Sequence, residues 1–294
     1  MKAAALDYVR VGTVAEALAL LDHHADGAKL VSGGQSLVPM LNLRLVSPTI
    51  LIDINGIDAL KSLGVVDTTI RIGALTRHVD LQRSELIREQ LPLLSLAIEH
   101  VAHPAIRNRG TIGGNLAHAD PASELPACML ALGAILIVAS SAGERRIPAA
   151  EFFLGTYETA LRPSDILIAI EIPIPPPGER VSFIELARRS GDYAILGLAA
   201  RARWNEEVMS ELTLVYFAVA DRPVFAAKAA ASLIGRPLND AVPHEAMTAL
   251  SEDLQPRNDP QATPEMRLHL ARVLLARSVE ALSLNKRQAA GHSP

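Results

Sequence analysis

The chain has 294 residues and a formal net charge of −4, with 49% hydrophobic and 20% charged residues. This length suits two domains with sizeable cores, and the composition is that of an ordinary globular protein. A slightly acidic chain without a basic run gives no reason to expect nucleic acid as a partner, and the single cysteine, Cys128, excludes an intrachain disulfide and an iron–sulfur cluster held by this chain alone.

The first 56 residues predict a small α/β lobe. Asp7 interrupts the apolar core that an export signal needs, so a cytoplasmic chain is expected. The capping box Thr13-Val-Ala-Glu16 predicts the start of a helix. Apolar runs at 29–32 and 49–54 predict two strands, and the first run leads into a double glycine, Ser32-Gly33-Gly34-Gln35-Ser36.

A second lobe, from about 57 to 175, mixes strands and helices without the regular period of a Rossmann domain. The strands are expected at 69–74, 134–139 and 165–173, and the helices at 79–86, 92–100 and around 125–132. A second double glycine, Thr111-Ile112-Gly113-Gly114-Asn115, lies between these helices. The apolar stretch 125–139 is too short to span a bilayer, so no membrane span is predicted.

A proline run, Ile174-Pro175-Pro176-Pro177-Gly178, predicts a break between two domains. Beyond it, the pattern predicts three strands at 181–186, 196–204 and 211–220, then three helices at 225–234, 243–254 and 263–284. Runs of strands followed by runs of helices are typical of an α+β domain. We therefore expect domains at 1–175 and 179–285, with a disordered tail at 286–294.

The two double glycines are the best candidates for a binding site. Glycine permits a positive φ and lets backbone N–H groups approach a ligand, and consecutive N–H groups can form a nest for an anion. Either pair alone would be read as an ordinary turn. Two nests suit a diphosphate, and Arg107 and Arg109 add positive charge beside the second pair.

Four motifs give the chain a resemblance to a known family. They are Ser32 to Arg44 (SGGQSLVPMLNLR), Ile106 to Ala117 (IRNRGTIGGNLA), Ile170 to Pro173 (IEIP) and Arg188 to Ala194 (RRSGDYA). The chain resembles the FAD-binding medium subunit of the molybdenum hydroxylases, the group of xanthine dehydrogenase and aerobic carbon monoxide dehydrogenase. The resemblance covers nearly the whole chain. It implies a two-lobed PCMH-type FAD-binding domain followed by a domain with a three-stranded antiparallel sheet and a helix bundle.

The resemblance also implies which residues hold FAD. The first double glycine would hold one side of the diphosphate and the second the other side, while 29–31 would line the adenosine. Glu124 would bind sugar or ribityl hydroxyls, Ile168 would pack near the adenine, and Tyr193 would reach the isoalloxazine. Ser32 stands where alanine is common in the family. The implied cofactor-binding residues are Lys29, Leu30, Val31, Ser32, Gly33, Gly34, Gln35, Ser36, Leu37, Ile106, Thr111, Gly113, Gly114, Asn115, His118, Glu124, Ile168 and Tyr193.

By this resemblance the chain is the electron-transfer subunit of an oxidoreductase complex. Electrons would come from [2Fe–2S] clusters in a small subunit, after hydroxylation at a molybdenum cofactor in a large subunit, and would leave FAD for an external acceptor. The acceptor (NAD, oxygen, quinone or a carrier protein) and the substrate stay open, and exposed apolar patches are expected where partners dock. The alternatives are a self-contained flavin-dependent oxidase or reductase, and a flavin-free assembly module.

Other residues that could carry chemistry have simpler explanations. His100, His103, His118 and Asp120 do not have the spacing of a zinc site and are expected to be loop or capping groups. His118 and Asp120 follow the second double glycine, so a contact with the flavin is a second possibility for them. Cys128 lies in an apolar helical pattern and is expected to pack in the core. No metal site and no catalytic residue are predicted in this chain.

Overall fold

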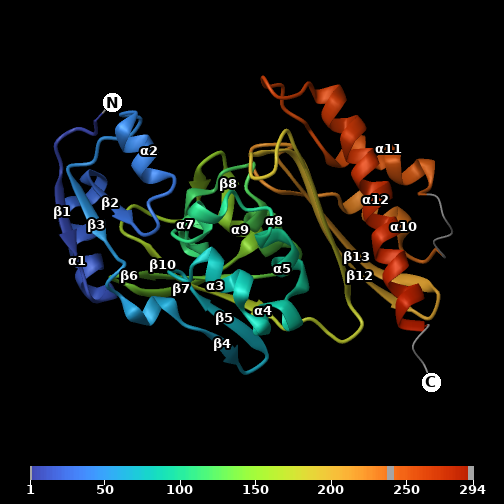
Figure 1. The fold of residues 1–294 in the computed structure, drawn as a ribbon, viewed down its shortest axis with the longest axis horizontal. Helices are drawn as coiled ribbons and strands as arrows, with labels where there is room; N and C mark the ends of the chain where they lie inside the picture. The colour runs from blue at the N-terminus through green and yellow to red at the C-terminus, as the bar shows by residue number, and fades with distance from the viewer. Residues whose placement is uncertain (1, 237–241, 291–294) are drawn as a thin grey trace. The chain divides into compact units, whose positions relative to one another are not determined.

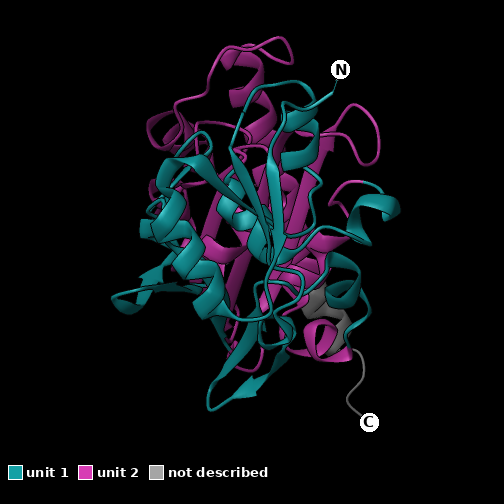
Figure 2. Ribbon diagram, turned by 90° about the vertical axis from the view of Figure 1, so that its left-hand side faces the viewer, with its two compact units in different colours: residues 1–84, 103–119, 133–173 teal, residues 85–102, 120–132, 174–294 magenta. Residues whose placement is uncertain are grey.

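The structure is a computed structural model that describes residues 2–236 and 242–290. The chain divides into two compact units, and each unit is built from stretches that are separate in sequence (Figure 2). Unit 1 contains 1–84, 103–119 and 133–173, and unit 2 contains 85–102, 120–132 and 174–294. These units differ from the sequential domains 1–175 and 179–285, which stay a prediction.

The first sheet of unit 1 has three parallel strands in the order β1 (Asp7–Arg10), β3 (Ile50–Asp53), β2 (Ala28–Val31). Strand β1 was not predicted. Helix α1 (Val14–His24) connects β1 to β2 through a short 3-10 turn, η1 (Ala25–Gly27).

The predicted capping box at the start of α1 is confirmed. The Glu16 N–H donates to Thr13 Oγ1 at 3.2 Å, and Glu16 Oε2 accepts from the Thr13 N–H at 3.3 Å. Both bonds satisfy backbone donors that an uncapped helix leaves open.

The second sheet of unit 1 is antiparallel, and its central strands were predicted. In spatial order the strands are β4 (Leu63–Val66), β5 (Thr69–Gly73), β10 (Ile166–Pro173), β6 (Ile135–Ser140) and β7 (Gly143–Pro148). The edge strands β4 and β7 were not predicted, because β7 is rich in charged residues and β4 contains a glycine. The register between β10 and β6 shifts at Ile168, which forms a bulge.

One hydrophobic cluster joins the two sheets of unit 1. It includes Ile52 of β3, Leu21 of α1, Ile137 of β6 and Ile166 of β10. The remaining elements of unit 1 are short: η2 (Asp58–Lys61), α2 (Leu37–Asn42), α3 (His78–Arg83), α6 (Pro104–Arg107), α7 (Ile112–His118), α9 (Ala149–Phe152), β8 (Phe153–Gly155) and β9 (Glu158–Thr159). The two predicted lobes therefore share one core.

Unit 2 is built on an antiparallel sheet in the order β11 (Arg180–Ala187), β12 (Ala194–Asn205), β13 (Val208–Phe217), β14 (Val224–Phe225). The sheet thus has a fourth strand beyond the three predicted. Strand β14 was missed because only two of its residues pair with β13.

The helices of unit 2 cover this sheet. They are α4 (Glu85–Gln90), α5 (Pro92–Ile98), α8 (Glu124–Ala131), α10 (Ala227–Leu233), α11 (His244–Asp253) and α12 (Pro264–Ala290). Figure 1 shows α10, α11 and α12 beside β12 and β13. The buried Tyr216 of β13 donates to the Ala271 carbonyl of α12 at 2.8 Å, which fixes this packing. Cys128 is buried within α8, as predicted.

The disordered tail expected at 286–294 stays a prediction. Helix α12 continues to Ala290, because 285–290 contain neither proline nor glycine to end it. Residues 291–294 lie outside the described residues. Among the described helices, none is long and apolar enough to cross a bilayer.

Candidate functional site

The two double glycines, far apart in sequence, lie against each other in unit 1. Ser32 Oγ is 3.0 Å from Thr111 Oγ1. A Cβ on Gly33 would be 2.5 Å from the Arg109 carbonyl oxygen and 2.8 Å from Gly110 Cα. Only glycine permits so close an approach of two backbones, so Gly33 lets the two segments meet.

The first double glycine leaves its backbone donors open. Gly34 has a φ of +71°, and the Gln35 amide donates to the Gly33 carbonyl at 2.9 Å. Within the described part of the chain, the N–H groups of Gly33, Gly34, Gln35 and Ser36 donate no hydrogen bond. A run of free N–H groups around a positive φ is the arrangement that binds an anionic oxygen.

The second double glycine is the first turn of helix α7 rather than an open loop. Thr111 is the N-cap, and its Oγ1 accepts from the Gly114 N–H at 3.1 Å. The Gly113 N–H donates to the Ala74 carbonyl at 2.9 Å, and the Ile112 N–H donates to the Thr76 carbonyl at 3.0 Å. These N–H groups already have acceptors, so a contact of Gly113 and Gly114 with a diphosphate stays a prediction.

Packing requires glycine at Gly113, whereas at Gly114 an added Cβ would meet only two side-chain hydroxyls. A Cβ on Gly113 would lie 2.5 Å from Ala74 Cβ, and a Cβ on Gly114 would lie 2.9 Å from Ser32 Oγ. Ala74 itself donates its N–H to the Ile168 carbonyl at 3.0 Å. These contacts place the start of α7 against the end of β5 and the bulge of β10.

Most of the other predicted residues also belong to unit 1. Lys29, Leu30 and Val31 form β2, and Leu37 opens α2. The Ile106 carbonyl accepts from the Gly110 N–H at 2.7 Å and so closes the turn before Thr111.

Three further predicted residues of unit 1 have clear surroundings. His118 lies against Tyr157, with ring centroids 4.8 Å apart. Ile168 is buried in the core of unit 1. Asn115 lies in α7, and its N–H donates to the Thr111 carbonyl at 3.0 Å.

Glu124 and Tyr193 belong to unit 2, so their contact with a ligand at the double glycines stays a prediction. The Glu124 carboxyl is buried at the first turn of α8, and this burial, with the nearby charge of Asp120, raises its pKa to about 7. Tyr193 is 64% exposed. Glu185 on β11 carries no signal in a single sequence. Burial and the charge of Glu124 raise its pKa to about 8.

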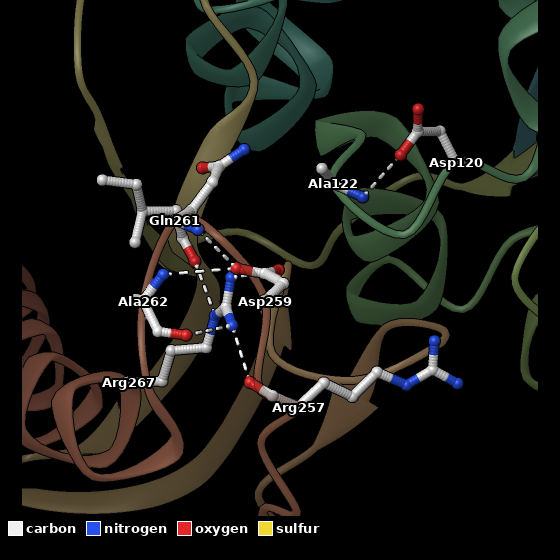
Figure 3. Close-up of polar contacts among 8 residues, drawn as sticks. Asp120, Ala122, Arg257, Asp259, Gln261, Ala262 and Arg267 are labelled. Atoms are coloured by element: carbon white, nitrogen blue, oxygen red, sulfur yellow. Dashed lines mark hydrogen bonds and ion pairs between the residues drawn. The ribbon is translucent and has the colours of Figure 1, made fainter.

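A buried arginine fixes the strand that follows Tyr193. Arg267 of α12 donates to the Ile195 carbonyl at 3.2 Å. It also donates to the Arg257 carbonyl at 2.7 Å and to the Asp259 carboxylate at 2.7 Å (Figure 3). Because Arg267 is buried and these bonds satisfy its guanidinium, it ties the start of β12 to the segment before α12.

Sequence reasoning missed two residues that touch the double glycines. The Asn55 amide donates to the Ser32 carbonyl at 2.8 Å, and the Arg77 guanidinium donates to the Arg109 carbonyl. Asn55 stands in an Asn-Gly pair after β3, which reads as a turn, and Arg77 stands in a plain polar run. Neither position carries a signal in a single sequence. Among the described residues, no group of three or more His, Cys, Asp or Glu side chains is arranged to hold a metal ion.

Comparison with protein-family models gives two matches. Residues 4–175 match the family described as FAD binding domain in molybdopterin dehydrogenase. Residues 181–282 match the family described as CO dehydrogenase flavoprotein C-terminal domain.

Similar individual proteins were also found. The 6-hydroxypseudooxynicotine dehydrogenase complex subunit alpha of Paenarthrobacter nicotinovorans is 46% identical over 207 residues, 70% of either chain. The carbon monoxide dehydrogenase medium chain of Hydrogenophaga pseudoflava is 33% identical over 275 residues, covering 94% of this chain and 96% of that one. A solved structure of carbon monoxide dehydrogenase from Hydrogenophaga pseudoflava, lacking the Mo-pyranopterin moiety of its cofactor, superposes with a TM-score of 0.93 at 34% identity, covering 97% of this chain and 99% of that one.

Proposed function

We propose that this chain, which belongs to the family of FAD-binding medium subunits of molybdenum hydroxylases, is the electron-transfer component of such a complex. The family resemblance read from the sequence is thereby confirmed, and with it the oxidoreductase class and FAD as the cofactor. In the proposed route, electrons come from the [2Fe–2S] clusters of a small partner subunit, and a large partner subunit holds the molybdenum cofactor.

The open donors of the first double glycine are the observation that best supports FAD binding at unit 1. FAD has a diphosphate at its centre, and the N–H groups of 33–36 can donate to its oxygens. Gly33 keeps these donors beside the start of α7, because no larger residue fits against the Arg109 carbonyl. The residues present therefore fit the cofactor that the family implies.

FAD, when bound, would supply the redox chemistry, and the described residues would supply its binding and orientation. Ser32 and Thr111 join the two segments through their hydroxyl groups. The buried carboxyls of Glu124 and Glu185 have pKa values raised to about 7 and about 8, so both groups are able to hold a proton near neutral pH.

The substrate of the complex is not set by this chain under the proposal. The relatives are named for a pseudooxynicotine derivative and for carbon monoxide, although each resembles this chain over most of its length. Similar flavin-binding subunits in complexes with different substrates are expected if another subunit selects the substrate.

Release of bound cofactor tests the proposal directly. The full-length chain is purified, heated, and the visible spectrum of the released material is recorded against a known FAD standard. Near-stoichiometric FAD is expected, whereas a chain that neither retains flavin nor rebinds added FAD contradicts the proposal.

Two further measurements separate the proposal from its rivals. Reduction of the flavin should require the partner subunits together with a substrate. Turnover of an organic substrate by the isolated chain would instead indicate a self-contained flavin oxidase or reductase.

A further inference from the structure

Asn55 ties the first double glycine to the end of β3. Its Nδ2 donates to the Ser32 carbonyl at 2.8 Å and to Asp53 Oδ1 at 2.6 Å. Its backbone N–H donates to the same Asp53 oxygen at 2.9 Å, and the Tyr8 hydroxyl donates to Asp53 Oδ2 at 2.5 Å. The Asn55 amide is therefore held in one orientation, with its Oδ1 free to accept from elsewhere.

Arg77 connects this amide to the second double glycine. One terminal nitrogen of its guanidinium donates to Asn55 Oδ1 at 2.6 Å, and the other donates to the Arg109 carbonyl. The backbone of Arg77 also forms an antiparallel bridge with Thr111. A planar guanidinium with two directed donors suits this bridging role. Asn55 and Arg77 together thus connect both double glycines.

The charge of Arg77 is balanced by carboxylates only at longer range, by Asp80 and Asp53. Both acceptors of its guanidinium are neutral oxygens, and no ion pair involves Arg77 within the described ranges 2–236 and 242–290. Two other half-buried arginines of unit 1 differ: Arg71 pairs with Glu171, and Arg145 pairs with Asp165 at 2.5 Å. A half-buried cation that makes no direct ion pair is stabilised when an anion binds beside it.

We propose that Asn55 and Arg77 are positioning residues that hold the two double glycines as one surface, and that the positive charge of Arg77 attracts the diphosphate of a dinucleotide to it. This inference rests on the proposed function, since it concerns the same site. It goes further because it gives Asn55 and Arg77, which lie outside both glycine motifs, a role in the geometry and the charge of that site.

The test compares two arginines of the same region. Arg77→Met removes the charge beside the double glycines, and Arg83→Met removes an equal charge from the exposed end of α3. FAD is titrated into the flavin-free full-length chain at low and high salt, and its Kd is measured by flavin fluorescence. Because Arg77→Met removes the positive charge that attracts the diphosphate, it should raise the Kd about tenfold and flatten its salt dependence, whereas Arg83→Met should change neither.

Two further variants separate charge from positioning. Arg77→Lys keeps the charge but loses the two directed donors of the guanidinium. The salt dependence of FAD binding should therefore persist while the Kd rises. Asn55→Ala removes the connection and keeps Arg77, so it should also raise the Kd with the salt dependence retained. Thermal unfolding of each flavin-free variant shows whether it is folded, and Arg77→Lys decides the test if Arg77→Met does not fold.

The outcomes distinguish this inference from the proposed function. A wild-type chain that binds FAD, with Arg77→Met and Arg83→Met binding equally well at both salt concentrations, overturns the role of Arg77 and leaves the proposed function standing. A wild-type chain that does not bind FAD overturns both.

Discussion

The two double glycines have nearly the same composition, yet the fold uses them differently. The first leaves the N–H groups of 33–36 open around a positive φ at Gly34. The second becomes the first turn of α7, where Thr111, Ala74 and Thr76 accept its N–H groups. The comparison teaches that a pair of glycines reports a close approach of backbones, whereas the acceptors around it decide whether its donors are available to a ligand.

The largest effect is expected from Gly33→Ala, because this residue joins the two segments. The added Cβ would meet the backbone of Arg109 and Gly110, which cannot move aside as a flexible side chain can. We expect loss of FAD binding and a decrease of about 3 kcal/mol in the free energy of unfolding, measured by urea denaturation.

Gly64→Ala is the matched control for Gly33→Ala. A Cβ on Gly64 meets nothing within 4 Å, so this variant should keep its stability and its FAD. If Gly33→Ala behaves like Gly64→Ala, the close contact between the double glycines is wrong.

The second effect concerns pH. It involves the buried His78, whose backbone N–H donates to the carbonyl of Gly110, the residue before Thr111. Burial, together with the charges of Arg107 and Arg77, lowers the pKa of His78 to about 4. The unfolded chain therefore binds a proton at His78 between pH 6.5 and 4 while the folded chain does not. This contributes stability above pH 6.5 that is lost as the pH falls, on the order of 3 kcal/mol by pH 4.

The pH effect is measured as a difference between two chains. Glu124 and Glu185, with raised pKa values, act in the opposite direction, losing stability as the pH rises through about 7 and 8. Urea denaturation of the wild type and of His78→Gln across pH 4 to 7.5 removes this background, and His103→Gln on the surface serves as control. Parallel curves for all three chains would contradict the burial of a neutral imidazole.

A smaller effect is expected from Thr111→Ala, which acts on the second double glycine alone. Loss of the N-cap hydroxyl leaves the Gly114 N–H without its acceptor, and the free energy of unfolding should fall by about 1 kcal/mol. Thr111→Ser keeps the hydroxyl and should retain most of the stability. Equal losses in both variants would show that the methyl group, not the cap, matters.

The smallest effect is expected from Ser32→Ala in the first double glycine. The Ser32 hydroxyl contacts Thr111 Oγ1, but Thr111 keeps its role as the cap without it. Denaturation should show a loss of about 0.5 kcal/mol, less than for Thr111→Ala. If Ser32→Ala loses more stability than Thr111→Ala, the Ser32 hydroxyl contributes more than the N-cap, which contradicts this prediction.

Several elements could be predicted because their signals lie close together in sequence. The capping box of Thr13 and Glu16 is complete within four residues, and the apolar runs of β3, β6 and β10 are continuous. The edge strands β4, β7 and β14 were missed, because a strand at the edge of a sheet needs little apolar sequence.

The sequence by itself determined that two glycine pairs and their flanking motifs define a family with a flavin. Only the tertiary structure decided which pair keeps its donors open, because the acceptors of the second pair, Ala74 and Thr76, stand more than 30 positions before it. The same holds for Asn55 and Arg77, whose roles depend on partners that folding brings near. A motif records the local backbone that a site needs, while hydrogen-bond partners and the pairing of charges arise from long-range contacts that no short pattern contains.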